Sequence, residues 1–352
     1  MKSLNLKNIK EIDSQKMLQL LMDFPLQCQM ALETANQAEI FHQRSFNKII
    51  FIGMGGSAIA GDLLKSYLYN ELNIPVMVFR EYHLPEFVDK NTLVFASSYS
   101  GNTEETLSCY MEAKKKGASI IGISSGGKLQ EEIVKDGNIF IPIPSGFPPR
   151  CALGYLSLIP LRILERIGMV KSKSGECSEM ISVLNELKDK HLNPHIAKHE
   201  NPAKYLAFNI CNKIPLLYSS SLYFDVVIAR FRAQINENAK SLAISNLLPE
   251  MNHNEIEGFA NIKKFAKHLV AIFLLDMDMH PRVKKRIEIT SQIIRDTGVD
   301  VFEVSSQGRG LLSRIFSLIY TVDFVSFYLA VLYDTDPTPV KKIAFLKEKL
   351  KE

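Results

Sequence analysis

Short apolar runs alternate with amphipathic stretches along most of the chain, and many of these runs end at glycine or hydroxyl residues. Fully apolar runs of four to eight residues are typical of buried parallel strands, and the stretches between them have the spacing of helices. The predicted strands are residues 48–52, 76–79, 93–96, 119–123 and 139–141 in the first half, and 214–221, 268–275 and 300–304 in the second. The pattern therefore predicts an α/β fold in which parallel sheets are flanked by helices.

Helical periodicity dominates both ends of the chain and its middle. An N-terminal helical segment runs from Glu11 to about His42, and Pro25 is expected to break it into two helices. Residues 153–167 predict a connecting helix, whereas residues 171–190 are polar enough to predict a mobile or surface crossover. The last helices are expected at 311–333 and from Pro339 onward, separated by a proline-rich break.

The second half repeats the first in outline, as a degenerate copy. A strand that runs into hydroxyls at residues 219–221, followed by a helix, matches the order of strand, turn and helix in the first half. The pattern predicts an N-terminal helical segment (1–45), a first α/β domain (46–155), a helical connection (156–200) and a second α/β domain (201–352), and the length of 352 residues suits about two domains.

Composition narrows the classes of function. The net charge of +4 is small, and the basic runs 114–116 and 282–286 are isolated, so they indicate solvated helix faces and not a nucleic-acid surface. Five scattered cysteines without a Cys-x-x-Cys pair favour a reducing compartment. The N-terminus lacks a signal-peptide pattern and no apolar run reaches membrane-spanning length, so we expect a cytoplasmic protein without membrane contact.

The stretch after residues 93–96 carries the strongest candidate chemistry. Ser98, Ser100 and Thr103 surround Gly101, just before an amphipathic helix. Hydroxyl donors together with helix N-terminal amides suit a phosphate group. The alternative is an ordinary helix N-cap, where serine and threonine are common.

A second glycine-rich turn follows residues 48–52. Gly55 and Gly56 would expose backbone amides beside Ser57 to a small anion or a sugar. A dinucleotide fingerprint is a weak alternative, because the third spaced glycine is missing and Glu81 lies in a loop.

Two further features raise the question of ligand binding. Arg150 ends a proline-rich stretch that enforces an extended backbone, and a rigid loop presenting one arginine invites an anion; the alternative is a linker with a surface arginine. His191, His195 and His199 recur at every fourth position, but Pro194 interrupts the helix that a metal site would need. Structural or surface histidines are favoured over a metal site, and we expect neither a metal nor a cofactor.

Acid–base chemistry is represented by Glu237 and His253. The first lies in Asn-Glu-Asn-Ala-Lys and the second in Asn-His-Asn-Glu. A carboxylate and an imidazole can share proton transfer near neutral pH, although each type alone is more often a surface or packing residue.

The ordered set of these motifs resembles the bifunctional phosphoglucose/phosphomannose isomerases. The motifs are Gly53–Ser57, Ser98–Glu104, Pro148–Arg150, Asn236–Lys240, Asn252–Ile256 and the C-terminal Asp336–Val340 with Leu346–Lys347. They extend from about Ile49 to Lys347, so the resemblance covers nearly the whole chain. It implies two sugar isomerase (SIS) domains, a homodimer, and metal-independent aldose–ketose isomerisation of glucose 6-phosphate and mannose 6-phosphate with fructose 6-phosphate.

The resemblance also assigns roles to the residues. It makes Ser57, Ser98, Ser100 and Thr103, with Gly55 and Gly56, the phosphate and sugar cradle. It makes Glu237 the base that moves a proton between C2 and C1. Arg150 would stabilise the cis-enediolate, and His253 would assist opening of the sugar ring. A C-terminal lysine would act at the ring oxygen. Lys347 is the first choice, with Lys341 and Lys342 as alternatives, and the threonine that admits either C2 epimer is Thr335 or Thr338.

A non-catalytic SIS module that senses a sugar phosphate is the alternative of a different class. Such a sensor would need the hydroxyl cradle, but it would not need Glu237, His253 and Arg150 together. The sequence therefore favours an enzyme.

Overall fold

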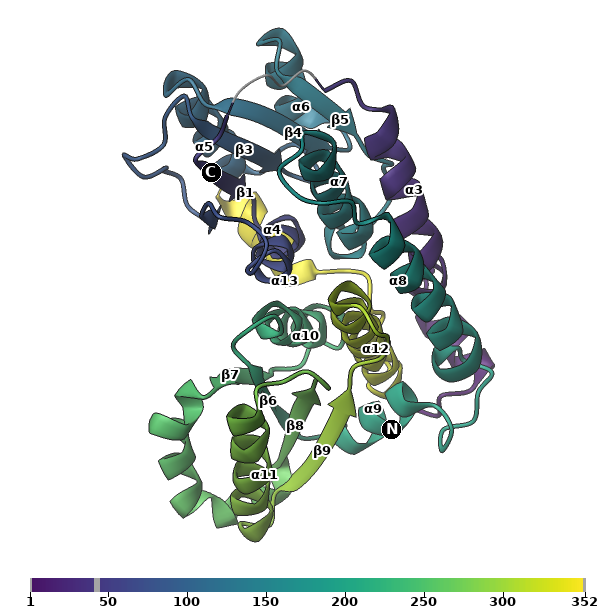
Figure 1. The fold of residues 1–352 in the computed structure, drawn as a ribbon. Helices are drawn as coiled ribbons and strands as arrows, with labels where there is room; N and C mark the ends of the chain where they lie inside the picture. Colours follow the sequence, from purple (N-terminus) through teal and green to yellow (C-terminus); the bar gives the residue numbers. More distant parts are fainter. Residues whose placement is uncertain (1, 41–44, 351–352) are drawn as a thin grey trace. The chain divides into compact units, whose positions relative to one another are not determined.

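The chain forms two compact units in the computed structural model, which describes residues 2–40 and 45–350 (Figure 1). One unit comprises Asp23–Ile181, and the other joins Met1–Met22 to Ser182–Glu352. The boundary after Ile181 falls inside helix α8 (Ser174–Leu187). The four-part division expected from the sequence stays a prediction.

The Asp23–Ile181 unit holds a sheet of five parallel strands in the order β2-β1-β3-β4-β5. Helix α3 lies along α7 in this unit (Figure 1). Its elements are α3 (Phe24–Gln37), β1 (Lys48–Ile52), α4 (Gly55–Tyr67), β2 (Val76–Phe79), β3 (Thr92–Ser97), α5 (Glu104–Lys115), β4 (Ser119–Ser124), α6 (Gly127–Lys135), β5 (Ile139–Pro142), a short 3₁₀ helix (Pro149–Cys151), α7 (Leu153–Arg166) and the first part of α8.

The central strands of this sheet are apolar throughout because helices cover both faces. Phe51 of β1 lies opposite Phe95 of β3 in the register, and their rings stack with centroids 5.0 Å apart. Gly61 of α4 lies directly on Phe51, since a Cβ at this glycine would come within 2.6 Å of the Phe51 Cβ. Helix α4 therefore packs closely on β1, which fixes the position of its N-terminus at the end of that strand.

The second unit repeats this topology with four parallel strands in the order β7-β6-β8-β9. Strands β6, β7, β8 and β9 take the places of β1, β2, β3 and β4, which confirms the predicted repeat. The elements are α1 (Leu6–Ile12), α2 (Met17–Met22), α9 (Pro202–Ile210), β6 (Ile214–Ser220), α10 (Asp225–Asn238), β7 (Ile244–Leu248), β8 (Leu269–Leu275), α11 (Pro281–Asp296), β9 (Asp300–Ser305), α12 (Leu311–Leu332) and α13 (Lys341–Lys349), with 3₁₀ turns between Glu250 and His268.

Helix α12 is the core helix of the second unit. The expectation that no apolar run reaches membrane-spanning length was wrong for this helix, whose length and apolar composition would allow it to cross a membrane, but all of its most apolar window is buried inside the protein. It packs against α2, α9 and α10 of the same unit. A helix that is apolar all round and covered on every side is typical of a protein core.

Several local expectations were wrong. Residues 171–190 are not a surface crossover, because most of them form α8, which buries one face that includes Cys177, Met180 and Leu184. Pro25 does not divide a helix: it lies in the first turn of α3, where its missing N–H costs nothing. Strand β7 was not predicted. The end of the N-terminal helical segment at His42 lies outside the described residues.

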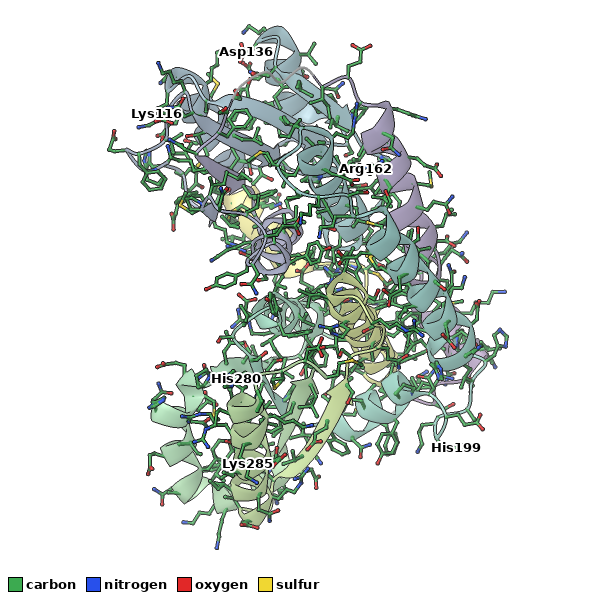
Figure 2. All side chains as sticks on the ribbon, in the orientation of Figure 1. Lys116, Asp136, Arg162, His199, His280 and Lys285 are labelled. Carbon is green, nitrogen blue, oxygen red and sulfur yellow. The ribbon has the colours of Figure 1, made fainter. Side chains whose placement is uncertain are left out.

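The histidine series and the basic runs lie on exposed turns and helix faces, as expected. Helical structure stops at Leu192, so His195 and His199 lie in turns and do not share a helix face with His191. Lys285 lies on the exposed side of α11, and Lys116 pairs with Glu86 at 3.1 Å (Figure 2).

Candidate active site

The first candidate loops meet at the topological switch point of the Asp23–Ile181 sheet. The chain leaves β1 toward β2 on one side and returns to β3 on the other, so the carboxyl ends of β1 and β3 are neighbours. Ligands of open α/β sheets bind at such a point. Gly53 is needed there for close approach, because a Cβ on it would lie 2.7 Å from the carbonyl oxygen of Ser97.

The loop after β3 carries the hydroxyls of the predicted cradle. The buried Ser98 donates from Oγ to Thr103 Oγ1 at 2.9 Å, while Ser100 is exposed. Thr103 is the N-cap residue of α5, but its side chain makes no capping hydrogen bond. The threonine oxygen is directed to Ser98 and accepts no hydrogen bond from the first-turn N–H groups of α5. A helix N-terminus with uncapped N–H groups stabilises an anion.

The cradle loop is held from one side by the loop between β4 and α6. Ser125 donates from both its N–H and its Oγ to the Tyr99 carbonyl, and the Leu129 N–H donates to the Gly101 carbonyl at 2.9 Å. Gly101 has a φ of +69°, and a Cβ there would lie 1.7 Å from the carbonyl oxygen of Gly126. Only glycine fits at this position.

We expect Gly101→Ala to destroy the cradle. The added methyl would force the two loops apart, so the dissociation constant for fructose 6-phosphate should rise at least about 10-fold, measured by titration calorimetry. Gly137→Ala is the matched control, since Gly137 has nearly the same φ of +68° but open space around it. Equal affinities of the two variants would show that the tight loop contact is unimportant for binding.

Arg150 reaches the same edge of the sheet, and it is not the surface arginine of the alternative interpretation. It lies in the 3₁₀ helix Pro149–Cys151, and only 4% of its surface is exposed. A Cβ on Gly56 would lie 3.1 Å from both the Arg150 Cα and the Pro149 carbonyl oxygen. The turn that carries the arginine therefore packs directly on the N-terminus of α4, beside Ser57.

Two buried residues that were not predicted position this turn. Gln27 of α3 donates to the Cys151 carbonyl and accepts from the Gly154 N–H, both at 2.8 Å. The Tyr99 hydroxyl accepts from the Phe147 N–H at 2.7 Å and donates to the Pro144 carbonyl at 3.1 Å. Burial raises the pKa of this phenol. The proline-rich loop is thus tied to the cradle loop through one tyrosine.

The corresponding edge of the second unit carries different chemistry. Asp276 follows β8 where the hydroxyl loop follows β3, and it is buried with Arg314, whose Nε donates to it at 2.8 Å. Ser306 donates to the same carboxylate at 2.7 Å. An internal ion pair occupies the place that the hydroxyl loop takes in the first unit.

Glu237 lies near the end of α10, whose inner face bears an unusual buried polar ladder. Arg230 forms a two-point ion pair with Asp323 of α12, with N–O distances of 3.0 and 2.6 Å, and Gln234 donates to the same carboxylate at 2.9 Å. One turn further, Asn238 donates to Ser326 at 2.9 Å. Because 230, 234 and 238 share one helix face, the ladder fixes the rotation of α10, and Glu237 lies off that face.

Glu237 lines a cavity of about 870 Å³ within the second unit. The loop and helix start that follow α12 form the opposite wall, with Thr335, Lys341 and Lys342 among the lining residues. Lys347 and Thr338 do not line it. The structure thus brings the candidate base together with the two alternative lysines and with one of the two candidate threonines.

His253 is exposed on a turn that is firmly anchored on both sides. Asn252 donates to Thr290 of α11 at 2.8 Å, and Glu255 accepts from the Tyr218 hydroxyl and from Asn246, each at 2.6 Å. Burial and the Glu255 carboxylate raise the pKa of Tyr218. His253 itself makes no hydrogen bond or ion pair with any residue in the described parts of the chain, so its imidazole faces solvent from a rigid support.

Within residues 2–40 and 45–350, no group of three or more His, Cys, Asp or Glu side chains is arranged to hold a metal ion. All five cysteines are buried as free thiols. The candidate groups of the Asp23–Ile181 unit are hydroxyls, backbone amides and a buried arginine, and those of the other unit are a carboxylate, an imidazole and lysines.

A fold of two repeated parallel sheets with this cradle defines a protein of the SIS class, and the comparisons with known proteins agree. Residues 43–136 match the model of the SIS domain, and residues 199–350 match the bacterial phospho-glucose isomerase C-terminal SIS domain. A hypothetical protein from Thermus thermophilus has the same fold at a TM-score of 0.75 and 14% identity, with 94% of this chain and 89% of that chain covered.

Similarity to curated sequences is closer. The chain is 44% identical to the bifunctional phosphoglucose/phosphomannose isomerase of Caldicellulosiruptor bescii over 96% of this chain and 99% of that protein. It is 38% identical to the protein of the same name from Aquifex aeolicus, over 87% and 91% of the two chains. The chain belongs to the family of bifunctional phosphoglucose/phosphomannose isomerases.

Proposed function

We propose that this chain interconverts fructose 6-phosphate with both glucose 6-phosphate and mannose 6-phosphate. The observation that carries the proposal is the convergence of three separate loops, ending in Ser57, Thr103 and Arg150, at one switch point in a chain that aligns with relatives of this name over nearly their whole length. Hydroxyls, helix N-termini and an arginine are the groups that bind a phosphorylated sugar.

The cradle residues would bind the phosphate. Ser98, Ser100, Thr103 and Ser57 supply hydroxyls, and the N-terminal amides of α4 and α5 add donors and positive dipole ends. Gly55 leaves open space in which the sugar phosphate would approach the backbone closely, and Gly56 lets the turn of Arg150 pack beside it. This binding step would fix the sugar before any proton is transferred.

Proton transfer would then be carried by Glu237. Its carboxylate takes the proton from C2 of the open-chain aldose, the electrons shift to the C1 carbonyl oxygen, and a cis-enediolate forms. The proton on the C2 oxygen moves to the C1 oxygen, and return of the carbon-bound proton to C1 gives the ketose. Arg150 stabilises the enediolate charge, because a fixed cation in a buried site is already oriented for it. His253 and a C-terminal lysine, Lys347 or one of Lys341 and Lys342, would open the sugar ring.

One assay tests the proposal against the sensor alternative. Purified protein is incubated with fructose 6-phosphate, and the aldose products are separated and identified. We expect both glucose 6-phosphate and mannose 6-phosphate to accumulate. Tight binding of fructose 6-phosphate without either product would instead identify a non-catalytic sugar-phosphate sensor.

We further propose a cytoplasmic homodimer in which His253 serves the site that contains Glu237 of the partner chain. An exposed imidazole on a rigid turn is suited to this role, and a two-fold interface would create two such composite sites. The five free cysteines are compatible with a reducing compartment.

Subunit mixing is expected to restore activity. Glu237→Gln chains mixed with His253→Ala chains would form dimers in which one site has both lesions and the other has neither. With random exchange about half of the dimers are mixed, so activity should recover to about a quarter of the parental value. If the subunits are shown to exchange and activity stays at the level of either variant alone, the histidine acts within its own chain.

A further inference from the structure

Lys240, three residues after Glu237, makes an unusual set of contacts. Its Nζ donates to four carbonyl oxygens, those of Glu237 (2.7 Å), Asn238 (3.2 Å), Asp336 (2.9 Å) and Pro337 (2.8 Å). An ammonium group has three N–H donors, so the four carbonyls share three protons. Two of these carbonyls belong to the end of α10, and two belong to the loop at residues 336–337. The lysine therefore ties the end of α10 to the loop that precedes α13.

The backbone of Lys240 adopts a conformation that normally favours glycine. Its φ is +54°, a left-handed conformation that is strained for any residue with a Cβ. Glycine is the usual residue just after a helix for that reason. Here the left-handed turn carries a lysine, and its side chain folds back to the carbonyls that α10 leaves open at its C-terminus, where a positive charge also complements the helix dipole.

Both segments that Lys240 joins form the wall of one cavity. Glu237 and Lys240 line it from α10, and Thr335, Asp336 and Lys341 line it from the loop and the start of α13. Glu237 is also restrained from its other side, because the Asn238 side chain is buried and bonded to α12. The Glu237 carbonyl accepts a hydrogen bond from the Lys240 ammonium, and the side chain of the next residue, Asn238, donates to Ser326 in the core.

We propose that Lys240 is a positioning residue that fixes the Glu237 carboxylate relative to the lysine-bearing wall of the cavity. The inference rests on the proposed function, in which Glu237 is the base. We call the four hydrogen bonds of the Lys240 ammonium the clamp. Losing this clamp would leave the cradle residues of the other unit intact, so substrate binding should persist. Misplacing a catalytic group by about 1 Å can cost about 100-fold in rate. The expected signature is a loss in kcat without a matching change in KM.

Lys240→Gly tests the proposal sharply, because it removes the ammonium and at the same time relieves the left-handed strain. The matched control is Lys16→Gly, since Lys16 has a similar φ of +59° in the same unit but lies outside the cavity. Isomerisation of fructose 6-phosphate and thermal unfolding are measured for both variants and for the parent. We expect the Lys240 variant to melt near the parental temperature, with kcat at least about 10-fold lower and KM within about threefold. The Lys16 variant should keep parental kinetics.

The outcomes are distinct. An inactive parent would refute the proposed function and, with it, this inference. An active parent together with a Lys240→Gly variant of parental kcat would refute the clamp alone, as would a variant whose loss lies in KM. If the Lys240 variant melts far below the Lys16 variant, Lys240→Arg decides the question: it keeps the positive charge, and recovery of kcat above that of the glycine variant supports positioning, whereas recovery of stability without kcat contradicts it.

Discussion

Glu237→Gln is expected to lower kcat by about 1,000-fold while leaving the fold and KM nearly unchanged. General-base catalysis contributes about 10²–10⁴-fold, and an amide of the same shape cannot accept the C2 proton. The half-buried position of Glu237 at the cavity wall tolerates this isosteric change without a new void. The measurements are steady-state turnover of fructose 6-phosphate and the wash-in of solvent deuterium at C1 and C2.

The control is Glu288→Gln, which changes an exposed glutamate on α11 that pairs only with Lys285 of the same helix in the described chain. Its turnover should equal that of the parent. Deuterium wash-in by the Glu237 variant at near the parental rate would show that another group moves the proton. Loss of wash-in and turnover together is the result that the assignment requires.

Asp323→Ala is expected to destabilise the protein by about 3–5 kcal/mol, the largest stability effect among the substitutions considered. The Asp323 and Arg230 side chains are each 3% exposed, and removal of the carboxylate would take from the Arg230 guanidinium its two-point partner in the core. Removing one partner of a buried ion pair leaves an uncompensated charge that costs this much. The loss of the Gln234 hydrogen bond adds to it.

Thermal and denaturant unfolding measure this effect, and the midpoint should fall by roughly 10 °C. Glu288→Ala is the matched control, because its ion pair with Lys285 is mostly exposed and such pairs contribute less than about 1 kcal/mol. Comparable midpoints for the two variants would mean that the ladder between α10 and α12 is not needed for stability.

Local pattern alone was sufficient for every strand except β7, for most helices and for the position of the hydroxyl-bearing loop after β3. Strand β3, the loop at Ser98–Thr103 and the start of α5 follow one another directly along the chain, so their chemistry can be recognised from spacing. The repeat of the fold was also predictable, because parallel strands covered on both faces must be continuously apolar. Strand β7 was missed since its mixture of polar and apolar residues suits an edge strand with partial exposure.

The sequence by itself determined the fold class, the two sheets and the identity of the candidate residues, because each depends on periodicity or on neighbours along the chain. Only the tertiary structure decided how those residues are supported. Gln27 donates to Cys151 in the turn of Arg150, 124 residues further along the chain, and the Arg230–Asp323 pair spans 93 residues. The role of Lys240 likewise depends on a loop 96 residues later. Such contacts leave no periodic signal, since their geometry arises only when distant segments pack together.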